Sequence, residues 1–324
     1  MKKVSILALH SAMAGSVMGP MDIFSQVGVS WNYIFGQDAA PFFDVKIVSM
    51  DGQPVTCFNN LVIQPHQSAH DVDTTDLIIV AAFANVERVI QSCQDAANWL
   101  KGQHAKGATI ASVCLGSFLL AETGLLNGKS ATTHWGYAHS FQRRYPQVRL
   151  KPEQIITDEG DLLCSGTYGS YIDLSFYLID RYCGRTKTLE SSKCMLHDRD
   201  RTSQAAYAVY RPAQHQDSKI ISSQKWIENN YSQPIDLDDL ACKCGMGRRT
   251  FERRFKTALG MTPFLYAQRM RIEAAKAYLE TTDNTFEEIA YQVGYENSSF
   301  FRKIFIKHTG LKPKEYQRKF QQVT

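Results

Sequence analysis

A chain of 324 residues, 44% of them hydrophobic and 21% charged, is long enough for two domains that each bury a core. No apolar run approaches the roughly 20 residues needed to span a bilayer, so a membrane-spanning helix is not expected. The basic excess lies in the last third: residues 217–324 hold 18 basic and 13 acidic side chains, a net charge of +5, whereas residues 1–216 carry −1. Such an asymmetry is expected where one domain meets a polyanion.

The chain starts with two lysines and a short apolar run, VSILAL, which His10 closes. A secretory signal peptide needs an apolar core of roughly 7–15 residues, so we predict a first β-strand instead. Eight cysteines without a dense spacing framework indicate reduced thiols and hence a cytoplasmic location. Cys242 and Cys244 have the wrong spacing for a zinc or redox pair, and we predict neither a metal nor a cofactor.

Strand-like and helix-like segments alternate through the first two-thirds of the chain. The strands are predicted at 4–9, 43–50, 76–83 and 109–114, and the helices between them at 21–35 and 87–103. Residues 156–166 then read as a hairpin around a Glu-Gly-Asp turn, and residues 170–184 as a helix. This alternation predicts an α/β domain with a flavodoxin-like, mainly parallel sheet that helices cover on both faces.

A polar, weakly patterned segment at 197–219 separates this domain from an all-α remainder. Pro212 and the run of Gln, His and Asp after it are typical of a linker. We therefore predict a first domain at 1–210, a linker at 211–218 and a second domain at 219–324.

One pattern occurs twice in the all-α remainder, at 237–263 and again at 286–313. In each copy an acidic–aliphatic–Ala triplet is followed four residues after the alanine by a glycine, Gly245 or Gly294. Glycine suits a tight corner between two helices because it has no Cβ to oppose a left-handed backbone. Each copy ends in a Gly-x-x-Pro stop. The repeat therefore predicts two helix-turn-helix units.

The second helix of each unit is predicted to enter the major groove of DNA. Its aromatic stripe faces the core, with Phe251 and Phe255 in the first unit and Phe300 or Phe301 with Phe305 in the second. The opposite, polar face can meet phosphates and base edges, although a solvated basic face is the alternative for any one charge. The predicted DNA contacts are Arg248, Arg249, Glu252, Arg253, Lys256, Asn297, Ser298, Ser299, Arg302 and Lys303.

These residues resemble the DNA-binding domain of the AraC/XylS regulator family over roughly 218–321. The resemblance implies that a long helix, at about 263–280, joins the two units so that both recognition helices can insert into successive major-groove turns. Gly247 departs from the serine that usually caps the first recognition helix in that family. Glycine is also accepted at an N-cap, so the predicted fold is unchanged.

Residues 109–135 are the most specific stretch of the first domain. A strand ends at Cys114, Gly116 permits a sharp turn, and a helix follows, so the thiol lies on an elbow where a helix N-terminus favours the thiolate. The stretch resembles the elbow of the DJ-1/PfpI, or class I glutamine amidotransferase-like, superfamily, and above all the members fused to AraC-type domains. This resemblance covers about 4–196 and implies a homodimer formed through the N-terminal domain.

Three catalytic parts of those enzymes are missing from this sequence. Leu115 follows the cysteine where the enzymes commonly have histidine, Ser16 stands near the acidic position, and residues 81–83 replace a glycine pair. A nucleophilic cysteine needs a base and an oxyanion site, so we predict that the chain is not an enzyme. The alternatives are a cysteine-dependent hydrolase or glyoxalase-like activity, and a redox sensor acting through Cys114.

The remaining site would lie at the carboxyl ends of parallel strands, where ligands usually bind in such sheets. We expect a sequence-specific DNA-binding transcription regulator whose partners are double-stranded DNA and a small-molecule effector. The family resemblance implies amino acids or amines as the effector class. The predicted ligand-binding residues are Ser16, Cys114, Leu115, His134, Trp135 and Tyr168.

Overall fold

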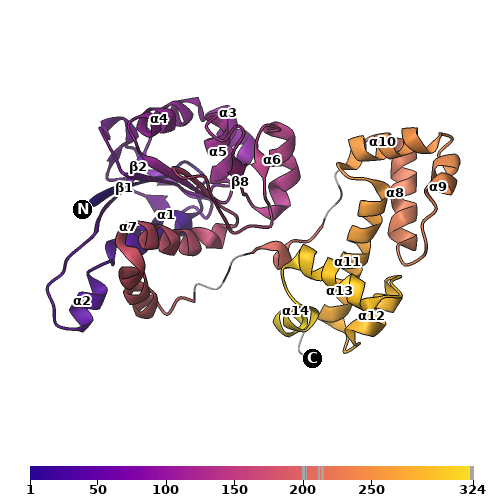
Figure 1. Ribbon diagram of the computed structural model, residues 1–324. Helices are drawn as coiled ribbons and strands as arrows, with labels where there is room; N and C mark the ends of the chain where they lie inside the picture. Colours follow the sequence, from indigo (N-terminus) through magenta and orange to yellow (C-terminus); the bar gives the residue numbers. More distant parts are fainter. Residues whose placement is uncertain (199–200, 202, 211, 213–214, 322–324) are drawn as a thin grey trace. The chain divides into compact units, whose positions relative to one another are not determined.

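The computed structural model describes residues 1–198, 201, 203–210, 212 and 215–321. The chain divides into two compact units, Met1–Gln204 and Ala205–Thr324, and each is described by itself (Figure 1). The predicted linker at 211–218 includes residues 211, 213 and 214, which lie outside the described residues. Its bounds, and those of the two predicted domains, stay a prediction.

The first unit is built on a seven-stranded sheet with the order β10-β11-β7-β6-β1-β2-β5. Every neighbouring pair is parallel except β10 with β11. The inner order β2-β1-β6-β7-β11 is that of a flavodoxin-like sheet, which confirms the predicted α/β fold. The strands are Lys2–Leu7 (β1), Phe43–Ser49 (β2), Gln67–Ser68 (β5), Leu77–Val80 (β6), Thr109–Val113 (β7), Ile156–Asp158 (β10) and Leu162–Ser165 (β11).

Helices cover both faces of this sheet (Figure 1). Helices α1 and α7 pack on one face, and α3, α4 and α5 on the other. All four residues of β6 are therefore buried, as the uninterrupted apolar run of a parallel strand requires. The helices are Ala14–Ser25 (α1), Ser30–Ile34 (α2), Val86–Gln91 (α3), Gln94–Ala105 (α4), Gly116–Glu122 (α5), Ala138–Arg144 (α6) and Tyr171–Met195 (α7), with short ribbons β3–β4 (Val55–Thr56, Val62–Ile63) and β8–β9 (Ser130–Ala131, Arg149–Leu150).

Three predicted helices have different bounds in the structure. The segment predicted as one helix at 21–35 forms α1 and α2, because Gly28 adopts a φ of +76° that a continuous helix does not allow. The segment predicted at 87–103 forms α3 and α4, which Ser92 and Cys93 separate. The helix predicted at 170–184 continues as α7 to Met195 beyond a kink at Gly184.

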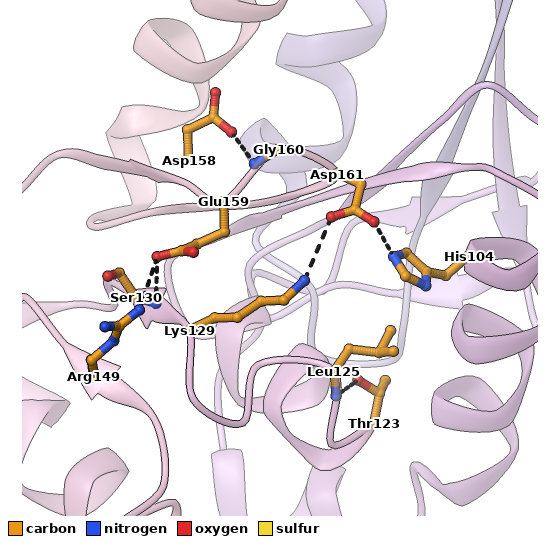
Figure 2. A network of polar contacts seen from close by, with 10 residues as sticks. All are labelled: His104, Thr123, Leu125, Lys129, Ser130, Arg149, Asp158, Glu159, Gly160 and Asp161. Atoms are coloured by element: carbon orange, nitrogen blue, oxygen red, sulfur yellow. Dashed lines mark hydrogen bonds and ion pairs between the residues drawn. The ribbon is translucent and has the colours of Figure 1, made fainter.

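A network of hydrogen bonds and ion pairs holds the β10–β11 hairpin at one end of the sheet (Figure 2). Asp161 of the hairpin turn lies 2.7 Å from Nε2 of His104 on α4 and 3.6 Å from Nζ of Lys129. Glu159 accepts a hydrogen bond of 2.7 Å from the backbone N–H of Ser130. These contacts fix the register of β11, whose last residue borders the cysteine elbow.

The second unit is helical and has two hydrophobic cores joined by the long helix α11 (Figure 1). This arrangement confirms the predicted pair of helix-turn-helix units. In the described part of the chain no helix is long and apolar enough to cross a membrane. The elements of this unit are a short 3₁₀ turn Ala205–Tyr207 (η4), Ser218–Asn230 (α8), Leu237–Lys243 (α9), Arg248–Leu259 (α10), Pro263–Thr281 (α11), Phe286–Gln292 (α12), Ser298–Thr309 (α13) and Pro313–Phe320 (α14).

Candidate functional site

Each recognition helix buries one aromatic stripe and leaves a polar face in solvent. Phe251 and Phe255 of α10 are fully buried, with ring centroids 5.7 Å apart. In α13 the buried pair is Phe301 and Phe305, whereas Phe300 is 55% exposed. The spacing of four residues therefore fixes which face of each helix is turned away from the core.

The polar face of α10 carries most of the predicted DNA contacts of the first unit. Arg249, Arg253 and Lys256 are exposed, and none of them forms an ion pair with the described residues. Arg248 differs, because its guanidinium lies 3.0 Å from a carboxylate oxygen of Asp238 on α9 and 3.1 Å from one of Glu252. Three cations are thus free to meet a polyanion, and a fourth is held between carboxylates.

The second recognition helix repeats this arrangement with different residues. Asn297 is the N-cap of α13, and its side chain accepts a hydrogen bond of 2.9 Å from the N–H of Phe300. Arg302 lies 2.5 Å from a carboxylate oxygen of Glu287 on α12. Ion pairs this exposed contribute at most about 1 kcal/mol, so a phosphate can replace the carboxylate. The remaining predicted contacts are Ser298, which is half-buried, and Ser299 and Lys303, which are exposed.

Arg271 of α11 ties the two helix-turn-helix units together. Its guanidinium donates to the carbonyl oxygens of Tyr231 (2.6 Å) and Gln233 (3.0 Å) beside the first unit, and to that of Gly294 (3.2 Å) in the corner of the second. The same group lies 5.0 Å from the ring centroid of Tyr295. Sequence reasoning missed this residue, because carbonyl acceptors leave no pattern in the sequence.

The two corners differ in length. Four residues, 244–247, connect α9 with α10, whereas five residues, 293–297, connect α12 with α13. As a result the position of Glu252 on α10 corresponds to that of Arg302 on α13. The two recognition helices therefore present different chemistry at the same place on the helix.

In the first unit, Cys114 lies at the strand-to-helix elbow between β7 and α5. Its φ of +54° is rare for a residue with a side chain, and its N–H donates to the carbonyl oxygen of Ser165 at 2.8 Å. Only 6% of the residue is exposed. Burial raises the pKa of the thiol to about 12, against the opposing effect of the N–H groups of Leu115 and Tyr168. Desolvation therefore outweighs the local dipole by which the helix N-terminus favours the thiolate.

Ser16, which stands near the acidic position in the sequence prediction, is fully buried in the first turn of α1. Its Oγ donates to the carbonyl oxygen of Met13 at 2.7 Å and accepts from the N–H of Ala82 at 2.9 Å. An N–H at the end of β6 that could stabilise an oxyanion is therefore satisfied within the protein. The phenol of Tyr168 lies against Gly15, where a Cβ would overlap its oxygen. The structure thus brings Ser16, Cys114, Leu115 and Tyr168 to one edge of the sheet.

Comparison with known proteins agrees with this geometry. A sequence model of the DJ-1/PfpI family matches residues 2–181. The chain belongs to the DJ-1/PfpI family. The fold of Drosophila melanogaster DJ-1beta covers 61% of this chain and 98% of its own, with a TM-score of 0.52 and 18% sequence identity. A sequence model of a helix-turn-helix domain matches residues 240–319 of this chain.

The relatives of this DJ-1/PfpI protein include regulators with both domains. The HTH-type transcriptional regulator GbdR of Pseudomonas aeruginosa is 27% identical over 272 residues, which cover 83% of this chain and 73% of that protein. The isonitrile hydratase of Pseudomonas putida is 31% identical over 144 residues, 44% of this chain and 61% of that enzyme. The DJ-1/PfpI protein is accordingly a DNA-binding transcription regulator of the AraC/XylS type.

His134 and Trp135 of the DJ-1/PfpI domain lie beside the elbow but make no dyad with the thiol. The hydroxyl of Thr133 donates to the carbonyl oxygen of Cys114 at 3.3 Å, which brings the next residue near. His134 itself accepts from the N–H of Gly136 at 3.1 Å, and its ring contacts that of Trp135. Burial lowers the pKa of His134. Within the described residues no hydrogen bond joins His134 to Cys114.

A cavity of about 910 Å³ lies at the carboxyl ends of β1, β2 and β6 of the DJ-1/PfpI domain. None of the six predicted ligand-binding residues lines it. Its wall includes Ser11, Asn60 and Asn85, each with a positive φ, and the exposed Arg88. Strained residues gather at functional sites more often than elsewhere. Sequence reasoning missed this cavity, and its signal is weak because Asn and Ser are ordinary loop residues.

Proposed function

We propose that a small metabolite bound in the DJ-1/PfpI domain controls how the regulator binds DNA. This proposal rests on the elbow at Cys114, where the groups that a catalytic site would need are buried or hydrogen-bonded within the protein. The thiol of Cys114 is buried and neutral at pH 7, and the N–H of Ala82 is taken up by Ser16. A site that keeps its shape without an activated nucleophile suits binding better than turnover.

Two positions at the carboxyl edge of the sheet are candidates for the effector-binding site. The first is the predicted set of elbow residues, Ser16, Cys114, Leu115, His134, Trp135 and Tyr168. The second is the cavity beside Arg88, whose volume lies within the roughly 300–1,000 Å³ of small-molecule sites. Amino acids or amines as effector class, a homodimer formed through the N-terminal domain and a cytoplasmic location all belong to this proposal.

Effector control is tested by a thermal-shift screen of metabolites on the full-length protein. A binder at a hundred times its Kd should stabilise its domain by about 2.7 kcal/mol, and each binder is then added to a DNA-binding titration. We expect at least one binder to change DNA affinity. Tyr168→Ala and Arg88→Ala then separate the two positions, because only the variant at the occupied site should lose the thermal shift. If binders shift the melting temperature and never DNA affinity, effector control is wrong.

A second candidate function is cysteine-dependent catalysis in the same domain, which the 31% identity to an isonitrile hydratase favours. We propose instead that the chain is not an enzyme, because the pKa of Cys114 lies near 12 and no base pairs with it in the described residues. A turnover assay that compares the native protein with Cys114→Ser decides between the two. Activity that depends on Cys114 would establish the enzyme.

The ten predicted DNA contacts form part of the same proposal, and two neighbouring arginines of α10 test it. Arg253 is exposed and unpaired among the described residues, whereas Arg254 is held by Asp217 through hydrogen bonds of 2.9 and 2.8 Å. We expect Arg253→Ala to weaken DNA binding by about 1–3 kcal/mol. Arg254→Ala, the matched control, should change affinity less than twofold, or about 0.4 kcal/mol.

Binding is measured by fluorescence anisotropy on a duplex that the native protein has selected from a random-sequence pool. If Arg253 contacts a phosphate, the slope of log affinity against log salt should also fall by about one. Equal losses for both arginine variants would show that the polar face of α10 does not meet DNA.

A further inference from the structure

The segment at 206–210 packs across both halves of the DNA-binding unit. It includes the last two residues of η4, the turn at which the second compact unit begins. We call residues 206–210 the strap. Although they are sequence neighbours of the predicted linker, most of their side chains have partners in the helices that follow.

The N-terminal end of the strap is part of the core of the second helix-turn-helix unit. Ala206 is 4% exposed and belongs to the same buried cluster as Phe301 and Phe305 of α13. The ring of Tyr207 packs edge-on against Phe320 of α14, with centroids 5.1 Å apart. Because η4 packs against α13 and Ala206 belongs to the core beneath it, moving Ala206 changes the support of this recognition helix.

A buried lysine fixes the middle of the strap to α11. The ammonium group of Lys276 donates to the carbonyl oxygen of Ala208 at 2.5 Å and lies 3.1 Å from a carboxylate oxygen of Glu273. The side chain of Lys276 is only 6% exposed. A buried ammonium group that loses one of its two partners costs free energy. The hydrogen bond from Lys276 therefore holds the strap in addition to its packing.

The C-terminal end of the strap reaches the first helix-turn-helix unit. The ring of Tyr210 lies 5.9 Å from that of Tyr266, and its hydroxyl donates to the sulfur of Met261 at 3.7 Å. Arg269 lies 5.4 Å from the ring of Tyr210 and 3.1 Å from Nδ1 of His308 on α13. Burial together with the charge of Arg269 lowers the pKa of His308 to about 4, so this contact is made by a neutral ring.

We infer that the strap is a structural part of the DNA-binding domain and that its residues position recognition helix α13. A chain segment held to α11 at Ala208 and Tyr210, and to the core beneath α13 at Ala206, can pass a displacement to α13 without a separate interface. If the proposed effector control is correct, which this second step requires, the strap is the connection through which the ligand-binding domain acts. Ala206 and Lys276 are thus positioning residues for DNA binding.

The test places the same charge at two positions of the strap in the full-length protein. Ala206→Glu puts a carboxylate into the core beneath α13 and should weaken binding to the selected duplex by about tenfold or more. Val209→Glu, the matched control at a residue 53% exposed, should change affinity less than about twofold. Hydrogen exchange should become faster in α13 and α14 of Ala206→Glu and stay unchanged in α9 and α10.

Lys276→Met keeps the test decisive if Ala206→Glu fails to fold. Methionine fills the buried space of the lysine stem without its charge, so the domain should fold while exchange at 205–208 and in α13 speeds up. The positioning role of the strap is contradicted if Ala206→Glu and Val209→Glu have equal DNA affinity and equal hydrogen exchange. Unchanged hydrogen exchange in α13 of Lys276→Met also contradicts it. These outcomes need no metabolite, so a native protein that ignores every metabolite contradicts the proposed function and leaves the strap intact.

Discussion

Gly294→Ala should abolish binding to the selected duplex, while Gly245→Ala at the matching corner should leave a folded protein that still binds. Both glycines have a positive φ, +88° at Gly294 and +64° at Gly245. An alanine in this conformation costs roughly 1–2 kcal/mol at either position. The difference between the two variants must therefore come from what the added methyl group meets.

At Gly294 the methyl group would overlap the backbone carbonyl of Ser232. A carbonyl in a packed turn cannot move aside cheaply, so either the corner opens or the loop before α9 shifts. At Gly245 the nearest atom is Nζ of Lys219, 3.3 Å away at the end of a flexible side chain. We expect Gly294→Ala to lose about 3 kcal/mol or more of stability and Gly245→Ala about 1 kcal/mol.

Both variants are compared with the native protein by chemical denaturation of the DNA-binding unit within the full chain and by anisotropy on the selected duplex. Hydrogen exchange locates the change, which should include 231–233 in Gly294→Ala. Similar stability and affinity for the two variants would mean that the close approach at Gly294 does not constrain the corner.

Arg271→Met should loosen the orientation of the two recognition helices relative to each other and weaken DNA binding. Neither helix-turn-helix unit should unfold. Three carbonyl oxygens lose a charged donor, and hydrogen bonds to charged groups are worth about 1.5–3 kcal/mol each, although solvent can replace part of this. We expect at least a tenfold loss of affinity, or about 1.4 kcal/mol, for the selected duplex. Arg271→Lys should recover little of it, because a single ammonium cannot reproduce the planar geometry of the guanidinium.

Duplexes of altered spacing give the sharper measurement for Arg271. The native protein should discriminate strongly against a duplex in which two base pairs are inserted between the two contacted segments. In Arg271→Met that discrimination should shrink, because a loosened α11 tolerates several spacings. If the variant keeps the native preference for spacing, the orientation of the units is set by α11 alone and Arg271 is dispensable.

The features that the sequence predicted well are those with local causes. The corners of the repeat, the Gly-x-x-Pro stops and the hairpin at 156–166 each depend on residues within a few positions of one another. The split of the helix predicted at 21–35 was missed because apolar periodicity continues through Gly28 while the backbone does not. The burial that raises the pKa of Cys114 was not foreseen, because burial cannot be read from an elbow motif.

Contacts between distant segments were beyond sequence reasoning. Nothing near Arg271 in the sequence indicates that its acceptors are three backbone carbonyls, and nothing near Ala206 indicates a core some hundred residues later. The cavity beside Arg88 is formed by turns after three different strands. The ligand and DNA contacts named from the sequence stay predictions, and Tyr168→Ala and Arg253→Ala each test one of them.

The difference between the two recognition helices gives the DNA-bound protein a direction. Because α10 and α13 place unlike side chains at matching positions, the two DNA segments that they are predicted to read cannot be interchanged. Reversing the recognised sequence would therefore turn the whole protein end for end along the double helix. Any contact that the regulator makes with another protein bound to the same DNA must then depend on which strand carries the site.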